Sequence, residues 1–385
     1  MLNFSYLNST QIHFGEGQIA TIVREIPADA RVLVLYGGGS IKKNGVYTQV
    51  SEALSQHEWF EFAGIEPNPQ YETLIKALPL IKEKQIHYLL AVGGGSVIDG
   101  SKFIAAAALF EGEEPWDIIA KRGKIKAALP LGVIVTLPAT GSESNNGAVI
   151  TRNGQKLPLN HPLIRPRFAI LDPSLTLSLS PRQIGNGVVD AFVHTIEQYL
   201  TYPVNAKVQD RFAEGLLLTL IEEGPKALAP KTQDDISVRG NIMWAASLAL
   251  NGLIGAGVPQ DWATHMIGHE LTAEFGVDHA RTLSIILPAT LKVRRESKRE
   301  KLLQYAARVW QLQEGDEEQR INDAIRLTEK FFRKMDLPTR LADVGIESSD
   351  IENIISRLQA HRMTRLGERR EVTLDISREI LQMAL

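Results

Sequence analysis

The chain has 385 residues, 44% of them hydrophobic and 23% charged, so it can bury a large core and is long enough for about two domains. Its formal net charge of −3 gives no electrostatic reason to expect nucleic acid or an anionic membrane as a partner. Cysteine is absent, which excludes disulfides and thiolate metal sites, and we see neither a signal peptide nor a membrane span, so we expect a cytoplasmic protein.

The first half of the chain alternates short apolar segments with amphipathic segments of helical period. Strands are predicted at Arg31–Tyr36, Trp59–Ala63, His87–Val92, Gly132–Leu137 and Arg167–Leu171, and helices at Ser40–Ser55, Tyr71–Lys84 and Val97–Leu109. Strands separated by helices of this length indicate βαβ units and a doubly wound, mostly parallel sheet. Ligands of such sheets bind beyond the carboxyl ends of the strands.

After Asp172-Pro173 the pattern becomes helical. Ser180, Pro181 and Gln183 form the signature of a helix start, with a capping serine, a proline in the first turn and a capping-box glutamine. Further helices are predicted at Val208–Leu228, Val238–Leu250, Ala263–Phe275, Lys301–Trp310, Ile321–Met335 and Thr373–Ala384, with no convincing strand. We therefore expect an α/β domain in residues 1–178 and an all-α domain in residues 179–385, with a cleft between them.

Two glycine-rich turns follow predicted strands. One consists of Gly37, Gly38, Gly39 and Ser40, and the other of Gly93, Gly94, Gly95 and Ser96. Neither is the GxGxxG fingerprint, but exposed amides at the start of a helix attract phosphate. A triple glycine can also be only a tight turn, whereas two such turns favour a phosphate site. A third segment, 136–145, is rich in hydroxyl groups and also follows a strand, although such clusters are common in loops.

One aspartate and four histidines recur at helical spacing. Asp190 and His194 are four residues apart, as are His265 and His269, and His279 follows His265 by fourteen residues. A single Asp–His pair of this kind is more often an ordinary hydrogen bond, and the HExxH pattern of a zinc protease is missing. Together, however, one carboxylate and several imidazoles favour a site for Fe²⁺ or Zn²⁺.

The chain resembles the iron-containing (group III) alcohol dehydrogenase family over essentially its whole length. The matching segments are GGGSVIDGSKFIAAA, LPATGSESNNGAVIT, PRFAILDPSLT, VVDAFVHTIEQYL and the block that contains His265, His269 and His279. Within the family, YGGGSIKKNG, GIEPNP and LNGLIGAGVPQDWATHMIGHELTA are most similar to the NADPH-dependent aldehyde reductases, also called butanol dehydrogenases. The resemblance also implies a homodimer.

The resemblance assigns roles to individual residues. It implies that Asp190, His194, His265 and His279 bind the metal and that His269 lies in the proton path. It places the pyrophosphate at Gly94, Gly95 and Ser96, with Asp99 nearby, and the adenosine part near Asn68. It places the nicotinamide along Thr136, Thr140, Ser142, Asn145 and Lys156.

The expected reaction is hydride transfer between NADP(H) and an aldehyde or primary alcohol, with the metal as Lewis acid. We expect NADPH rather than NADH, because the small, neutral turn at Gly38, Gly39 and Ser40, followed by Lys42 and Lys43, can accept a 2′-phosphate that a carboxylate would repel. Two alternatives stay open. One is a metal-dependent sugar-phosphate lyase resembling dehydroquinate synthase, which would need clustered basic residues, and the other is a nucleotide- or metal-binding protein without activity.

Overall fold

The structure is a computed structural model that describes residues 1–385 and divides into two compact units. The sheet unit comprises Leu7–Leu179 and Asp234–Ser247, and the helical unit comprises Met1–Tyr6, Ser180–Gln233 and Leu248–Leu385. Residues 1–6, which precede the sheet unit in the chain, pack with the helical unit. Residues 234–247, which lie between two segments of the helical unit, pack with the sheet unit.

The sheet unit is built on six strands in the order β1-β8-β5-β4-β2-β3, and every pairing between them is parallel. The strands are β1 (Gln11–Phe14), β2 (Val32–Tyr36), β3 (Trp59–Phe62), β4 (Tyr88–Gly93), β5 (Leu131–Val135) and β8 (Phe168–Leu171). The four central strands are buried along their whole length, as expected for a parallel sheet that is covered on both faces. The predicted fold class, a parallel α/β sheet followed by a helical region, is confirmed.

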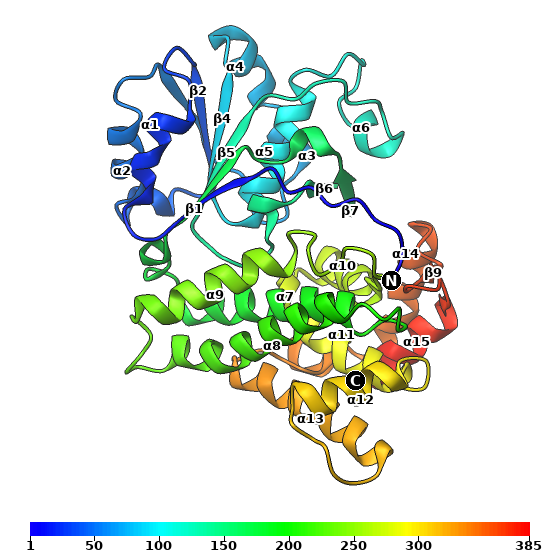
Figure 1. The fold of residues 1–385 in the computed structure, drawn as a ribbon. Helices are drawn as coiled ribbons and strands as arrows, with labels where there is room; N and C mark the ends of the chain where they lie inside the picture. Colours follow the sequence, from blue (N-terminus) through cyan, green and yellow to red (C-terminus); the bar gives the residue numbers. More distant parts are fainter. The chain divides into compact units, whose positions relative to one another are not determined.

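Alternate residues of the strands face two separate cores. Val32 and Val34 point to the core that contains α1 (Ile22–Glu25) and α2 (Val46–Ala53), and Leu33 and Leu35 point to the core on the opposite face. The second core contains α3 (Tyr71–Leu74), α4 (Ala77–Lys84), α5 (Gly95–Ala107) and α6 (Asp117–Ala120). Figure 1 shows α1 and α2 on one side of the sheet and α3 and α5 on the other.

Several elements of the sheet unit differ from the prediction. The predicted helix at Ser40–Ser55 is a 3-10 turn at Ser40–Lys42 followed by α2, because Gly45 between them adopts a φ of +82°. The predicted helix at Tyr71–Lys84 is interrupted between α3 and α4, since Pro79 in the first turn of α4 cannot continue a helix from α3. The hairpin of β6 (Gly147–Arg152) and β7 (Gln155–Asn160), like β1, was not predicted. The helix α9 (Ile236–Ala249) lies mostly in this unit.

The helical unit contains eight helices. They are α7 (Pro181–Tyr199), α8 (Lys207–Leu228), α10 (Ala263–Phe275), α11 (His279–Val293), α12 (Arg299–Arg308), α13 (Glu317–Lys334), α14 (Ile351–Ala360) and α15 (Leu374–Met383). The predicted capping box at the start of α7 is present, with Ser180 accepting from the Gln183 amide. The expectation of no strand after residue 178 is wrong in one place. The two-residue strands β9 (Arg365–Leu366) and β10 (Val372–Thr373) pair antiparallel, and they are too short to produce a periodic pattern.

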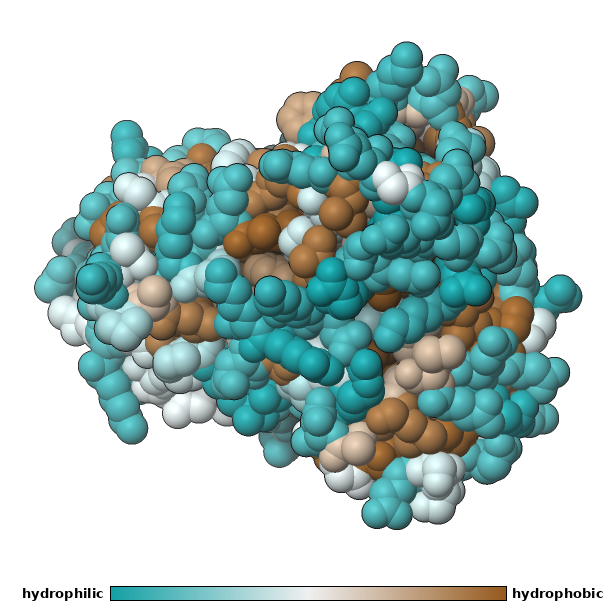
Figure 2. Space-filling model, turned by 90° about the horizontal axis from the view of Figure 1, so that it is seen from below, coloured by the Kyte–Doolittle hydropathy of each residue, from teal (hydrophilic) through white to brown (hydrophobic).

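The surface matches the composition of the chain. In Figure 2 the visible face is largely hydrophilic, and apolar side chains form separate patches on it. None of the helices has the length and apolar character that crossing a membrane would demand.

Candidate functional site

Three helices of the helical unit carry the residues predicted to bind a metal. Asp190 and His194 lie on α7, His265 and His269 on α10, and His279 is the first residue of α11. Because α11 packs against both α7 and α10, these side chains come from elements that are in contact with one another.

Asp190, His265 and His279 form a compact group of potential ligands. Each offers one ligand atom, and these atoms all lie within 4.8 Å of one another. Asp190 Oδ1 is 3.7 Å from His279 Nε2 and 3.8 Å from His194 Nδ1, which is too long for hydrogen bonds. Atoms that bind one cation tetrahedrally at about 2.1 Å lie about 3.4 Å apart, so the observed separations are close to those that a shared cation requires.

The surroundings of Asp190 fit a metal ion. Its side chain is 4% exposed, and Oδ1 is buried without making a hydrogen bond. A buried carboxylate oxygen is unfavourable unless positive charge compensates it, and a divalent cation bound at this group would supply that charge. One carboxylate with several imidazoles is also a donor set that suits Fe²⁺ or Zn²⁺.

The two other predicted residues lie beside this group. The ring of His194 stacks on that of His265 with 4.7 Å between centroids, although His194 is not among the three residues whose ligand atoms lie within 4.8 Å. The ring of His269 is 5.1 Å from that of His279 and 6.3 Å from that of His265. The structure therefore brings all five predicted residues of the helical unit together, and three of them at ligand distance.

Two residues of this site were not predicted. Glu197 of α7 is hydrogen-bonded through Oε2 to His265 Nδ1. Trp262, just before α10, places its ring 5.2 Å from that of His265 and adopts a φ of +63°, a strained backbone conformation for a bulky residue. Glu197 had a sequence signal, because it follows Asp190 by seven residues and so lies on the same helix face. Trp262 had none.

In the sheet unit, the second glycine turn joins β4 to α5. Gly94 caps α5 and Gly95 is its first residue, so their backbone amides lie at the helix N-terminus. A Cβ on Gly95 would lie 2.5 Å from Thr140 Cγ2, and one on Gly94 would lie 3.1 Å from Leu137 Cβ. The segment after β5 thus packs directly onto this turn, and only glycine fits there.

The residues predicted to contact the dinucleotide form two connected groups. In the first, Lys156 Nζ donates to Asn68 Oδ1 at 2.8 Å, and the Asn68 amide donates to Ser96 Oγ at 3.3 Å. The resemblance placed Asn68 and Lys156 at opposite ends of the dinucleotide. The structure brings these two side chains into direct contact, and their roles at the dinucleotide stay predictions.

The second group lies in the segment that follows β5. Ser142 Oγ donates to Asp99 Oδ1 at 2.6 Å, the Ser142 amide donates to Thr140 Oγ1 at 3.2 Å, and Thr136 donates its amide to the Gly93 carbonyl at 3.0 Å. These contacts tie the segment to the turn between β4 and α5. Asp99 is half-buried and also accepts the Val149 amide, so its position is that of a support for Ser142.

The first glycine turn, Gly37 to Ser40, follows β2. The predicted positive charge beside it needs a correction, because Lys42 Nζ is 2.9 Å from Glu61 Oε2. The Glu61 carboxylate also accepts hydrogen bonds from the hydroxyls of Tyr36 and Tyr47. The charge of Lys42 is thus compensated within the protein, so the prediction rests on the small, neutral turn and on Lys43.

A buried lysine that was not predicted organises the second group. Lys102 of α5 is fully buried, and its Nζ donates to Ser142 Oγ at 2.9 Å, Asn145 Oδ1 at 2.9 Å and the Gly147 carbonyl at 2.6 Å. Burial lowers the pKa of Lys102 to about 8. Three acceptors converge on one ammonium group, which therefore fixes the segment after β5.

Replacing Lys102 by methionine is expected to destabilise the protein by about 3 to 5 kcal/mol, the usual cost of removing one partner of a buried charged group. It is also expected to weaken NADPH binding, because Ser142 and Asn145 lose their common donor. Urea unfolding and a fluorescence titration with NADPH measure the two effects. Lys301→Met is the matched control, since Lys301 is a buried lysine of the helical unit and should leave NADPH affinity unchanged.

The wild type and the Lys102→Met variant also test the pKa of Lys102. A folded-state pKa below the ordinary 10.5 means that the unfolded chain binds the proton more tightly between pH 8 and 10.5. The stability of the wild type relative to Lys102→Met should therefore rise with pH across this window. A difference between their free energies of unfolding that stays constant across this window would contradict the lowered pKa of Lys102.

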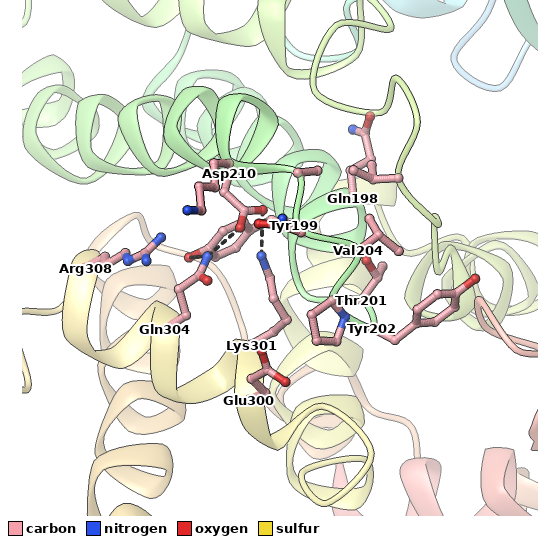
Figure 3. A pocket seen from close by; sticks show the side chains of 15 residues that line it. Gln198, Tyr199, Thr201, Tyr202, Val204, Asp210, Glu300, Lys301, Gln304 and Arg308 are labelled. Atoms are coloured by element: carbon pink, nitrogen blue, oxygen red, sulfur yellow. Dashed lines mark hydrogen bonds and ion pairs between the residues drawn. The ribbon is translucent and has the colours of Figure 1, made fainter. Parts of the chain in front are cut away.

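A polar pocket of about 470 Å³ lies in the helical unit, between the end of α7 and the helices α8 and α12 (Figure 3). It contains none of the predicted site residues. Lys301 and Gln304, which point into it, both bind Asp210, at 2.6 and 2.9 Å. Its polar groups are thus bonded to one another. We therefore base the function on the group of Asp190, His265 and His279 and not on this pocket.

The architecture places the chain in a known structural class. It superposes on a solved structure of YqhD from Escherichia coli K-12 with a TM-score of 0.97 at 57% identity, covering 100% of this chain and 99% of that one. It superposes on NADH-dependent butanol dehydrogenase A of Thermotoga maritima with a TM-score of 0.94 at 34% identity, covering 100% and 99%. A parallel sheet unit followed by a helical unit of this kind is thus the fold of a group of dehydrogenases.

Sequence comparison identifies the family. Residues 9–173 match the family described as iron-containing alcohol dehydrogenase, and residues 185–385 match its C-terminal part. The chain belongs to the iron-containing alcohol dehydrogenase family, as its resemblance indicated. It is 57% identical to the NADPH-dependent aldehyde reductase YqhD of E. coli K12 over 100% of both chains, and 40% identical to NADP-dependent alcohol dehydrogenase 3 of Entamoeba histolytica over 94% of each.

Proposed function

We propose that the protein is a metal-dependent, NADPH-linked aldehyde reductase that interconverts a broad range of aldehydes and primary alcohols, including butanol. The observation that carries the proposal is the compact group of Asp190, His265 and His279 in a chain of this family. The names of relatives support the substrate class, since they include an NADPH-dependent aldehyde reductase and several butanol dehydrogenases.

The proposed metal ligands are Asp190, His194, His265 and His279, which would hold one Fe²⁺ or Zn²⁺. The cation would polarise the carbonyl oxygen of the aldehyde, and NADPH would supply the hydride. Asp190 must be ionised and the imidazoles neutral to bind it, so acid pH is expected to weaken the site. We assign to His269, beside His279, the role of holding the proton that the product alcohol gains at oxygen.

The proposed nucleotide site uses backbone amides more than charged side chains. The amides of Gly94, Gly95 and Ser96, at the start of α5, would bind the pyrophosphate. The small turn from Gly37 to Ser40 would accept the 2′-phosphate. Ser142 and Asn145 are held by Lys102, so they would present their polar groups to the ligand in a fixed orientation.

The proposal is tested by mixing the metal-loaded protein with NADPH and butanal and following the absorbance of the reduced nicotinamide. Loss of absorbance at a rate that depends on both reactants is the expected result. NADPH binding without turnover would instead mean a binding protein without this activity.

Removing the metal with a chelator is expected to stop turnover and lower the melting temperature by several degrees. A cation that binds only the folded state stabilises it by about 3 to 4 kcal/mol when present at 100 to 1000 times its Kd. Adding back Fe²⁺ or Zn²⁺ should restore both properties. Mg²⁺, which prefers oxygen ligands, serves as the control and should restore neither. Full activity of a protein shown to be free of metal would contradict the proposal.

We also propose that the protein acts in the cytoplasm and forms a homodimer. The absence of cysteine suits a reducing compartment. Light scattering of the purified protein measures its mass. A single chain has a mass of 42.6 kDa, and a dimer has about twice that mass.

A further inference from the structure

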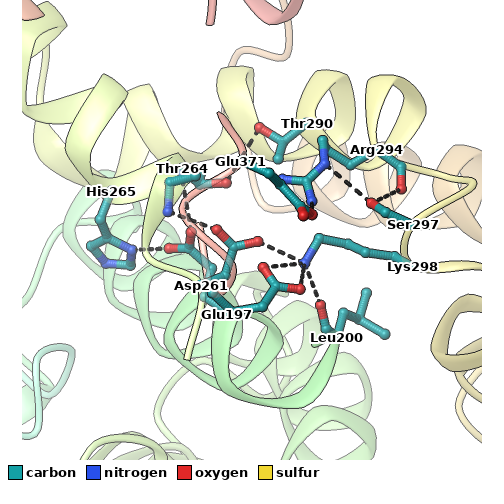
Figure 4. Close-up of polar contacts among 12 residues, drawn as sticks. Glu197, Leu200, Asp261, Thr264, His265, Thr290, Arg294, Ser297, Lys298 and Glu371 are labelled. Carbon is teal, nitrogen blue, oxygen red and sulfur yellow. Dashed lines mark hydrogen bonds and ion pairs between the residues drawn. The ribbon is translucent and has the colours of Figure 1, made fainter. Parts of the chain in front are cut away.

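Both carboxylate oxygens of Glu197 are directed at the start of α10. Oε2 is hydrogen-bonded to His265 Nδ1, and Oε1 accepts the Thr264 amide at 2.7 Å (Figure 4). A cation would therefore bind His265 through Nε2, because Nδ1 lies against the carboxylate. The side chain of Glu197 is 3% exposed, so this contact is shielded from water.

A buried lysine holds the elements that carry Glu197 and His265. Lys298, 2% exposed, donates to Asp261 Oδ2 at 2.6 Å and to the carbonyl of Leu200, in the residue after α7, also at 2.6 Å. It also pairs with Glu368 at 3.0 Å. One ammonium group thus ties the end of α7 to the turn before α10, as the converging dashed lines in Figure 4 show.

The backbone completes the connection. The amide of Asp261 donates to the carbonyl of Glu197 at 2.9 Å, and Asp261 Oδ1 accepts the Ala263 amide at 3.0 Å. The side chain of Glu197 therefore reaches His265 from a backbone position that is itself bonded to the residues leading into α10. Rotation of either side chain would leave a buried donor or acceptor unsatisfied.

We propose that Glu197 is a positioning residue of the metal site, which fixes the tautomer and the ring orientation of His265, and that Lys298 holds Glu197 and α10 in register. This inference rests on the proposed function, because it concerns a ligand of the proposed metal. A carboxylate that accepts Nδ1–H keeps the lone pair of His265 on Nε2 and makes that nitrogen a stronger ligand. Removing such an outer partner typically weakens metal binding by 10- to 100-fold.

The test is Glu197→Gln, which keeps the size of the side chain but leaves one oxygen for two N–H donors. The full-length protein is freed of metal, and the affinity for Zn²⁺ is measured by competition with a coloured chelator. Co²⁺ is then bound in place of Zn²⁺, because its visible spectrum reports the geometry of the ligands. We expect a 10- to 100-fold weaker Zn²⁺ affinity and an altered Co²⁺ spectrum.

Glu214→Gln is the matched control for loss of a buried carboxylate in the same unit. Glu214 is 5% exposed, and its carboxylate binds Tyr199, Arg308 and Gln304 rather than a histidine. Glu214→Gln should lower the free energy of unfolding about as much as Glu197→Gln does. The Zn²⁺ affinity and the Co²⁺ spectrum should stay unchanged. Asp190→Asn is the second reference, because it removes a proposed ligand and should abolish tight binding.

The outcomes separate the inference from the proposed function. Weakened binding in Glu197→Gln with normal binding in Glu214→Gln supports the positioning role. Normal affinity and spectrum in Glu197→Gln, while Asp190→Asn fails to bind, overturns the inference and leaves the metal site standing. Equal weakening in both glutamate variants would also overturn it, since the effect would then be general. Normal binding in Asp190→Asn would overturn the metal site itself.

Discussion

Replacing His194 by alanine is expected to remove the bound metal and to lower kcat/KM for aldehyde reduction by more than about 100-fold, since the loss of an outer partner alone typically costs 10- to 100-fold. The affinity for NADPH should not change, because the predicted nucleotide residues belong to the sheet unit and His194 to the helical unit. Elemental analysis gives the metal content per chain, steady-state kinetics gives kcat/KM, and a fluorescence titration gives the Kd for NADPH.

The matched control is His361→Ala. His361 is a largely buried histidine of the same unit, and its Nδ1 is 2.6 Å from Glu270 Oε1. Its replacement should lower stability without loss of metal. A His194→Ala protein that reduces aldehydes at the parental rate would show that the assigned ligand set is wrong. This result matters most for His194, because it is the one assigned ligand outside the group within 4.8 Å.

The helices that carry the metal residues could be predicted from sequence because their signals are local. The predicted helix at Ala263–Phe275 matches α10, and the capping box at Ser180 marks the start of α7. The helix α11 was not predicted, because Pro288 within it removes a backbone donor and interrupts the apparent pattern. His279 was therefore selected by its residue type and spacing, without knowledge that it opens a helix.

The hairpin of β6 and β7 shows the limit of periodic patterns. Its strands are joined by a turn at Asn153 and Gly154, both with positive φ, and β7 contains Pro158 and three polar residues among its six. These features resemble those of a loop in the sequence. The strand β1 was missed because it has four residues, none of them buried.

The contacts that support both sites could not be predicted for a different reason. Lys102 meets Ser142 and Asn145 across about 40 residues of sequence, and Glu197 meets His265 across 68. No local pattern announces such contacts, because only the packed fold brings the partners together. The charge at Lys42 shows the same limit, because only the structure places Glu61 beside it and compensates it.

Cofactor choice is the second result with a large expected effect, and Gly38→Asp is the variant that tests it. The preference for NADPH over NADH, measured as the ratio of kcat/KM values, should fall by about 100-fold or more. A carboxylate about 4 Å from a unit negative charge raises its energy by about 1 to 4 kcal/mol in surroundings between water and a protein surface, and a 2′-phosphate carries more than one charge. The 2′-hydroxyl of NADH instead accepts a carboxylate as a hydrogen-bond partner.

The structure selects Gly38 over its neighbours. A Cβ on Gly37 would lie 3.0 Å from the backbone oxygen of Ile65, and Gly39 has a φ of +89°, which would strain any other residue. An aspartate at Gly39 would therefore test backbone strain together with charge, whereas an added Cβ at Gly38 meets no atom within 4 Å.

Gly38→Asn separates charge from size. Asparagine has nearly the shape of aspartate, so a loss of NADPH preference in Gly38→Asp that is absent in Gly38→Asn must come from the negative charge. The comparison is informative because relatives in this family are named for either cofactor, including the probable NADH-dependent butanol dehydrogenase 1 of Bacillus subtilis at 39% identity. Family membership alone therefore leaves the choice open, and we propose that the turn after β2 decides it. If the ratio stays at the parental value in Gly38→Asp, the 2′-phosphate is bound elsewhere, and the neutral turn is no more than a tight connection between β2 and the residues that follow.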